Sequence, residues 1–141
     1  MLNNYEYITE PMGFVMFDLN NLKCANDTYG HAVGDQLITN FARLLRNAIP
    51  AKDFVGRYGG DEFIAIITQT TKNEILKIMD EVHDEVRHFN ENIHKVEVSY
   101  AYGYAFSEDY ADCTIKTLFD KADKHMYENK AIEKAKFEAI V

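Results

Sequence analysis

Two consecutive glycines, Gly59 and Gly60, divide the stretch between Phe54 and Thr68 into two short apolar segments. A glycine pair in this position is typical of a β-hairpin, because glycine adopts the backbone angles of tight hairpin turns without steric strain. Strands joined by such a turn are antiparallel, so the pattern disfavours an all-parallel, doubly wound sheet. It favours an α+β fold in which helices pack on a mixed, mainly antiparallel sheet.

The spacing of apolar residues predicts the other elements. The nearly unbroken apolar run 12–19 predicts a strand buried on both faces, and the polar stretch 20–35 that follows is rich in turn-forming pairs. Apolar residues at helical spacing predict helices over 37–49, 71–89 and 115–126, and strands are expected over 96–106 and 137–141.

Two local patterns sharpen this outline. Thr71 and Glu74 form a capping box, which starts a helix by satisfying free backbone N–H groups. In the expected strand 96–106, large residues alternate with Ala101, Gly103 and other small residues. A strand face made of small residues lets a helix approach closely, so we expect a helix packed against this face.

Length and charge exclude several classes of protein. A chain of 141 residues with 47% apolar and 27% charged residues fits one folded domain rather than a disordered segment. A net charge of −8 excludes a general binder of nucleic-acid polymers and direct contact with an anionic membrane, because both partners need a basic face. Any anion held by this domain therefore needs a few local cations or metal ions.

The location that the sequence predicts is the cytoplasm, either for a separate domain or for the cytoplasmic part of a larger protein. Cys24 and Cys113 lie far apart and form no metal-binding pair, which favours reduced thiols. No apolar run approaches the roughly 20 residues that span a bilayer, and the N-terminal residues lack the pattern of a secretion signal.

Three carboxylates are the first candidates for chemistry. Asp18 closes the apolar run 12–19, where it could be a metal ligand or the N-cap of a following helix. Asp61 and Glu62 follow the glycine pair, on a turn where a ligand can approach the backbone closely. Taken alone, two acids on a hairpin are most often a solvated turn.

A longer series of motifs is more specific. It comprises Asp-Leu-Asn-Asn-Leu-Lys at 18–23, Asn-Asp at 26–27, Gly-His at 30–31, Gly-Asp at 34–35, and Arg57 followed by Gly-Gly-Asp-Glu-Phe at 59–63. In this order and spacing the series resembles the GGDEF family of diguanylate cyclases, from about Phe14 to Lys134. The resemblance implies a single GGDEF domain over 1–141, with a ferredoxin-like core similar to the palm of polymerases and nucleotidyl cyclases.

The resemblance also implies an activity. Members of the family condense two GTP molecules into cyclic di-GMP and release two pyrophosphates. The 3′-hydroxyl of each GTP attacks the α-phosphate of the other across a homodimer, so the expected partners are GTP and a second GGDEF domain. An upstream sensory domain is expected as well.

The family's functional residues carry over by position. Asp18, Asp61 and the Leu19 carbonyl match the ligands of two Mg²⁺ ions, for which Mn²⁺ could substitute, and Asp18, Asp61 and Glu62 match the catalytic acids. The remaining matches are substrate-binding: Asn26 and Asp35 for guanine, Lys23, Lys130 and Lys134 for the triphosphate, and Arg57, Gly59 and Gly60 on the hairpin. The structural alternatives are an Asx-turn at Asn26, a helix N-cap at Asp35 and a solvated helix face for the lysines.

The sequence departs from the family pattern at several points. Lys134 stands where members commonly carry an arginine, and Asn20 stands where many carry a second aspartate. Pro50 replaces the arginine of an inhibitory Arg-x-x-Asp product site, although Asp53 is present, so we expect weak product inhibition there. The usual N-terminal helix and Asp-x-Leu-Thr-Gly segment are missing from this chain.

Three hypotheses follow from these observations. The first is a catalytically competent diguanylate cyclase domain. The second is a catalytically weak or inactive GTP-binding module that regulates an attached domain. The third, a purely structural dimerisation domain, leaves the acids and Asn26 without a role.

Overall fold

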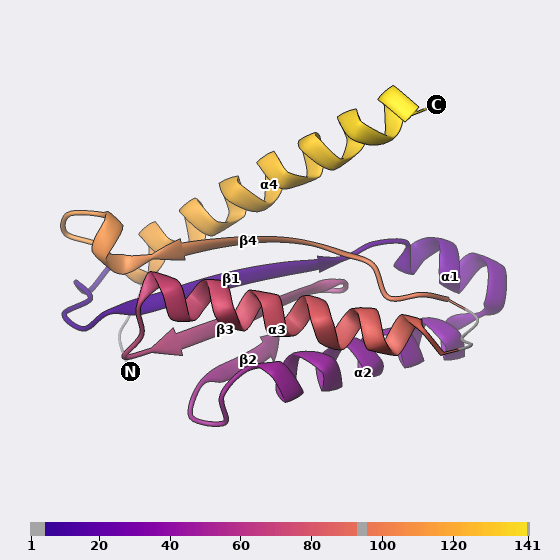
Figure 1. Cartoon of the computed structure of the whole chain (residues 1–141), viewed down its shortest axis with the longest axis horizontal. Coiled ribbons are helices and arrows are strands. Elements are labelled where there is room, and N and C mark those ends of the chain that lie inside the picture. The colour runs from indigo at the N-terminus through magenta and orange to yellow at the C-terminus, as the bar shows by residue number, and fades with distance from the viewer. Residues whose placement is uncertain (1–4, 93–95, 141) are drawn as a thin grey trace.

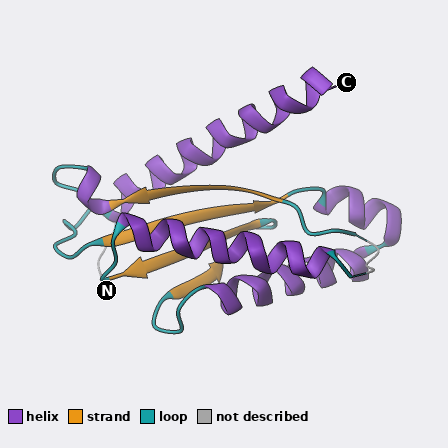
Figure 2. Cartoon of the chain, viewed as in Figure 1, coloured by secondary structure: helices purple, strands orange, loops and turns teal. Residues whose placement is uncertain are grey.

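A four-stranded antiparallel sheet forms the centre of the molecule, which is a computed structural model describing residues 5–92 and 96–140 (Figure 2). The strand order is β2-β3-β1-β4, and every neighbouring pair is antiparallel. The strands are β1 (Met12–Leu19), β2 (Phe54–Arg57), β3 (Glu62–Thr68) and β4 (Tyr100–Phe106). The predicted hairpin and the α+β class with a ferredoxin-like strand order are confirmed.

Helices cover both faces of this sheet. They are α1 (Leu22–Tyr29), α2 (His31–Ala48), α3 (Lys72–Asn90) and α4 (Ile115–Ile140), with a short 3₁₀ turn at Ser107–Asp109. Figure 1 shows α2 and α3 side by side on one face, while α4 lies on the other and extends past the sheet. No helix within the described residues is long and apolar enough to cross a membrane.

The central strand β1 is buried on both faces, as its apolar run predicts. Val15, Phe17 and Leu19 pack into the larger core beneath α2 and α3, and Phe14 and Met16 pack beneath α4. Burial of apolar surface on two sides gives this strand a fixed register, because a slip by one residue would exchange the two faces. The residues at its C-terminal end are therefore held by a rigid support.

The small-residue face of β4 admits α4 at very close range, which confirms the prediction from sequence. A Cβ atom added at Gly103 would overlap the Ala122 carbonyl and the Met126 backbone N–H and would lie 2.8 Å from Met126 Cα. Two α4 side chains then reach over the outer edge of the strand. Asn129 Nδ2 donates to the Tyr102 carbonyl at 2.7 Å, and the Tyr104 N–H donates to His125 Nδ1 at 3.0 Å.

Three expectations about element boundaries are wrong. The polar stretch 20–35 is helical for most of its length, because Gly30 at φ 91° separates two helices instead of interrupting a loop. Strand β4 starts at Tyr100 rather than at 96, since the Asn90 side chain bonds both the N–H and the carbonyl of Val98.

The third error concerns the C-terminus, where a strand over 137–141 was expected. Helix α4 continues to Ile140, and Val141 lies outside the described residues. Neither glycine nor proline occurs after Gly103, and the segment is rich in alanine, glutamate and lysine, which favour helix. Thr71, by contrast, caps α3 as expected, accepting the Glu74 N–H at 3.2 Å.

Candidate functional site

The three acids meet at one end of the sheet. Asp18 is the penultimate residue of β1 and lies opposite Glu62 in the β1–β3 register. The Leu19 N–H donates to the Asp61 carbonyl at 2.8 Å, which ties the end of β1 to the tip of the hairpin. Sheet pairing thus brings together residues that are more than forty positions apart in the sequence.

Asp18 is the most enclosed of these acids. Its side chain is 12% exposed, and its Oδ2 atom forms an ion pair with the Lys130 ammonium, which α4 brings over the sheet end. Its Oδ1 atom is buried and accepts no hydrogen bond from any residue that the structure describes. A buried carboxylate oxygen without a partner is unfavourable, so this atom is open to a cation or a donor from a ligand.

The pKa values of the two neighbouring acids, Asp61 and Glu62, are both raised. Burial, followed by the negative charge of Asp18, raises the pKa of Asp61 above its usual value. Burial and the charges of Asp18 and Asp61 raise the pKa of Glu62, and Lys130 offsets part of both effects. Both shifts are those expected for acids that are partly buried beside other negative charges.

The donor set suits a hard divalent cation that shares its ligands with a substrate. In the described residues no group of three or more His, Cys, Asp or Glu side chains is arranged to hold a metal by itself. Mg²⁺ commonly takes one or two carboxylates and completes its shell with water and phosphate oxygens. Asp18, with its open Oδ1, and Asp61 fit this pattern.

The hairpin tip is braced by Arg57. Its Nε donates to the Gly59 carbonyl at 3.0 Å, and its Nη2 donates to the Gly60 carbonyl at 2.8 Å. The Tyr58 N–H also donates to the Glu62 carbonyl, at 2.8 Å. Arg57 was expected to bind substrate, and in this structure its guanidinium holds the turn that carries Asp61.

A second group of predicted site residues lies on the first two helices. Asn26 is on α1 and partly buried, whereas Asp35 is on α2 and exposed. Both structural alternatives are wrong: Asn26 is helical rather than in an Asx-turn, and α2 begins four residues before Asp35, with Gly30 as its N-cap. Asp18 likewise does not cap a helix, because Asn21 occupies the N-cap position of α1.

The predicted phosphate-binding lysines are distributed around the acids. Lys23 is exposed in the first turn of α1, Lys130 contacts Asp18, and Lys134 is exposed one turn further along α4. Of the three, Lys130 is the one that the structure places in contact with a predicted metal ligand.

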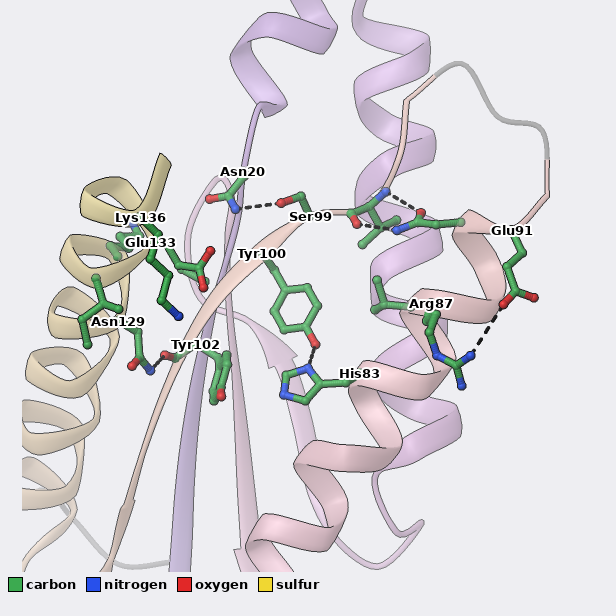
Figure 3. Close-up of a pocket in the computed structure, with 16 residues that line it drawn as sticks. Asn20, His83, Arg87, Glu91, Ser99, Tyr100, Tyr102, Asn129, Glu133 and Lys136 are labelled. Carbon is green, nitrogen blue, oxygen red and sulfur yellow. Dashed lines mark hydrogen bonds and ion pairs between the residues drawn. The ribbon is translucent and has the colours of Figure 1, made fainter. Parts of the chain in front are cut away.

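A groove of about 1080 Å³ runs along the outer edge of β4, between α3 and α4 (Figure 3). Its lining includes Asn20 and Lys130, the residue that pairs with Asp18, but neither of the predicted guanine-binding residues, Asn26 and Asp35. Within it, His83 and Tyr100 point toward each other and form a hydrogen bond (Figure 3).

Sequence reasoning missed two positioning contacts. Asn20 Nδ2 donates to Ser99 Oγ at 3.0 Å, which joins the residue after β1 to the segment before β4. Gly34 packs directly on the Asn26 side chain. Neither contact had a local signal, because Gly34 lies in the stretch 20–35 that was expected to form turns, and the first contact joins residues 79 positions apart.

Asp53, the remaining half of the expected product site, is fully engaged inside the fold. Its side chain is completely buried, and its Oδ1 accepts hydrogen bonds from the N–H and the hydroxyl of Thr68, each at 2.9 Å. Lys52 donates to both carboxylate oxygens, at 3.0 and 3.2 Å. Asp53 therefore joins the start of β2 to the end of β3.

Comparison with known proteins adds an independent finding. The model of a family described as "Diguanylate cyclase, GGDEF domain" matches residues 1–136. "Diguanylate cyclase A" of Treponema denticola is 28% identical over 123 residues, which cover 86% of this chain and 33% of that protein. "Probable diguanylate cyclase DgcI" of Escherichia coli is 34% identical over 125 residues, covering 87% of this chain and 26% of that protein.

A solved structure agrees with these relatives. The GGDEF domain of YfiN (TpbB) from Pseudomonas aeruginosa superposes with a TM-score of 0.76 at 30% identity, covering 86% of this chain and 77% of that one. The chain spans about a third or less of the length of the two curated relatives.

Proposed function

The chain belongs to the diguanylate cyclase GGDEF domain family, and on this premise we propose that it condenses two GTP molecules into cyclic di-GMP and two pyrophosphates. The observation that carries the proposal is the open Oδ1 atom of Asp18, buried beside Asp61 at the end of a rigid strand. A carboxylate in this state suits a centre that is completed by a metal–triphosphate complex.

The proposed metal ligands are Asp18, Asp61 and the Leu19 carbonyl. Two Mg²⁺ ions, or Mn²⁺ in their place, would polarise the α-phosphate, favour ionisation of the 3′-hydroxyl and neutralise the leaving pyrophosphate. Asp18 and Asp61 hold their oxygens at the strand end, and Arg57 fixes the turn that carries Asp61. Glu62 is the second acid of the hairpin and adds negative charge to the same site.

The lysines supply the positive charge that the triphosphate needs. Lys130 neutralises Asp18 in the protein alone and is within reach of an anion bound at the same place. Lys23 stands at the start of α1, where free backbone N–H groups also favour phosphate. Lys134 keeps the charge of the family's arginine but lacks its two-pronged hydrogen bonding, so we expect looser phosphate binding there.

Guanine recognition is proposed for Asn26 and Asp35, with Gly59 and Gly60 leaving room for the substrate at the hairpin. A carboxylate accepts hydrogen bonds from N1 and N2 of guanine, and an amide can bond the remaining edge. Adenine lacks this pattern and would leave the carboxylate unpaired, which penalises ATP.

Turnover needs a second nucleotide whose 3′-hydroxyl faces the first. The residues proposed here hold one GTP, so a second copy of the domain would present the other, and we propose a homodimer as the active state. The curated relatives extend well beyond the matched segment. We accordingly infer a sensory domain on the same protein and a cytoplasmic location for this one, where GTP is supplied.

A second candidate is a GTP-binding regulatory module with little or no turnover. The observation that favours it is the Lys130 ammonium on Asp18, which occupies one oxygen of a proposed metal ligand. Binding of GTP without product at high protein concentration would support this candidate.

The test is to incubate concentrated protein with GTP and Mg²⁺ and to separate the nucleotides by chromatography. We expect cyclic di-GMP from the natural sequence, no product when EDTA is added, and a loss of about 10³-fold for Asp61→Asn. Asp84→Asn, an equal change of charge at an exposed position on α3, is the matched control and should retain full activity. A fully active Asp61→Asn variant would overturn the proposed site.

A further inference from the structure

Gly34 stands at a position where glycine is unfavourable for the helix that contains it. It is the fourth residue of α2 and is buried. In a helix interior, alanine is strongly preferred over glycine. The φ angle of Gly34 is not positive, so the backbone at this position would accept alanine. The reason for glycine must therefore lie in the space around it.

That space is filled by a single side chain. A Cβ atom at Gly34 would overlap Asn26 Oδ1 and would lie 2.7 Å from Asn26 Cγ and 3.3 Å from Asn26 Nδ2. All three nearest atoms belong to the Asn26 amide, so the missing methyl group leaves the volume that this amide occupies. The Asn26 side chain makes no hydrogen bond to any residue that the structure describes, and its amide packs directly on Gly34.

We propose that Gly34 determines base specificity by positioning Asn26, so that the amide lies against α2 beside Asp35 and reads guanine. The inference rests on the proposed function, in which Asn26 and Asp35 recognise the base of GTP. Gly34 itself would not touch the nucleotide; it acts through the room that it leaves.

The contacts around Gly34 predict that Gly34→Ala affects nucleotide binding without affecting folding. The atoms that a Cβ would displace are at the far end of a flexible side chain on an exposed helix, so Asn26 can rotate toward solvent. Gly34→Ala thus keeps the helix and its packing, and alanine favours the helical state. The variant is expected to fold as well as the natural sequence and to lose the oriented amide.

The experiment measures equilibrium binding of 3′-deoxy-GTP and 3′-deoxy-ATP in the presence of Mg²⁺. Both probes lack the attacking hydroxyl, so binding is measured without turnover. We compare the natural sequence with Gly34→Ala, Asn26→Ala and the double variant, and use Gln36→Ala as a control on the exposed side of α2. Melting temperature is recorded for every variant.

For Gly34→Ala we expect affinity for 3′-deoxy-GTP to fall about tenfold, with unchanged affinity for 3′-deoxy-ATP and a melting temperature within about 4 °C of the natural sequence. Asn26→Ala should cause the same loss, and the double variant should be no worse than Asn26→Ala alone. Gln36→Ala should bind as the natural sequence does.

Two outcomes would overturn the inference while leaving the proposed function standing. One is unchanged affinity in Gly34→Ala when Asn26→Ala loses affinity. The other is an additive loss of about 100-fold in the double variant, which would mean that Gly34 acts independently of Asn26. If Asn26→Ala itself binds 3′-deoxy-GTP normally, both this inference and the proposed guanine contact fail.

Discussion

Asp18, in β1, and Asp53, directly before β2, are both buried aspartates, but the groups that surround their carboxylates differ. Asp53 Oδ1 accepts two hydrogen bonds from Thr68, and Lys52 donates to both of its oxygens. Asp18 Oδ2 pairs with the Lys130 ammonium, while Oδ1 accepts no hydrogen bond within the described part of the chain. One carboxylate is saturated with donors from the chain, and the other is left partly open.

The difference separates two uses of a buried charge. A saturated carboxylate contributes to the fold, because its donors replace the water lost on burial. An open one costs stability in the protein alone, and that cost is recovered when a ligand supplies the missing partner. We therefore predict that Asp53 stabilises the hairpin and that Asp18 takes part in the proposed chemistry.

Asp18→Asn is the substitution with the largest expected effect, and it tests whether Asp18 differs in role from Asp53. We expect cyclic di-GMP formation to fall about 10³-fold, because the metal would lose a charged ligand. The melting temperature in EDTA should change little, since the lost Lys130 pair is offset by reduced repulsion with Asp61. A large fall in melting temperature with retained turnover would place Asp18 with Asp53 as a structural residue.

Asp53→Ala should give the opposite result. The free energy of unfolding is expected to fall by about 3 kcal/mol, because the partly buried Thr68 N–H and hydroxyl lose their acceptor. Product formation per folded molecule, and its inhibition by added cyclic di-GMP, should not change. Denaturant titration and a product titration at low temperature measure the two effects. If product inhibition were relieved in this variant, Asp53 would instead be part of a site that binds the product.

Lys130→Met tests the ion pair between Lys130 and Asp18. In EDTA we expect the free energy of unfolding to fall by about 1 kcal/mol, a modest value because the lysine is partly exposed. Adding Mg²⁺ with 3′-deoxy-GTP should recover most of this loss, since the cation takes over the neutralising role. Lys124→Met, an equal charge change on an exposed part of α4, should show neither effect.

The smallest predicted effect is a pH dependence of stability that comes from His83, which lies apart from both Asp18 and Asp53. Burial lowers the pKa of His83 on α3, while the nearby Asp80 and Asp84 act in the opposite direction and Tyr100 bonds its ring. A histidine whose pKa is lower in the folded state contributes stability above its unfolded pKa of about 6.5, and this contribution is lost as the pH falls through the folded value.

Melting curves recorded as the pH is lowered from 7 should therefore show a steeper loss for the natural sequence than for His83→Gln, which cannot titrate. Equal slopes for the two proteins would show that His83 does not set the acid sensitivity of the fold. If activity fell at low pH while the melting temperature did not change, the loss would be assigned to protonation of the carboxylates in the proposed site.

Most features that depend on neighbouring residues in the sequence were predicted correctly. The hairpin, the buried strand β1 and the small face of β4 follow from local patterns that tertiary packing reinforces. Asp18 and Asp61 were identified through the spacing of motifs, and the sheet register then placed them at one end.

Features that depend on distant partners were not predictable in the same way. The saturation of Asp53 requires Thr68, and the open Oδ1 of Asp18 results from how β1, the hairpin and α4 meet. The bounds of helix α1 were not predicted, because Asn and Asp residues favour turns locally, whereas packing against α2 holds this segment helical. The prediction of a C-terminal strand was wrong because the apolar residues after 136 continue helix α4, which contains no glycine or proline to end it.

The reach of α4 over the edge of β4 has a consequence for behaviour at high concentration. An uncovered edge strand is a template on which another chain can add a strand, and this is a common start of aggregation. His125 and Asn129 occupy the Tyr104 N–H and the Tyr102 carbonyl with side-chain groups, which leaves an incoming strand without those two bonds. At high concentration this stretch of the edge therefore resists fibril-like pairing with another chain.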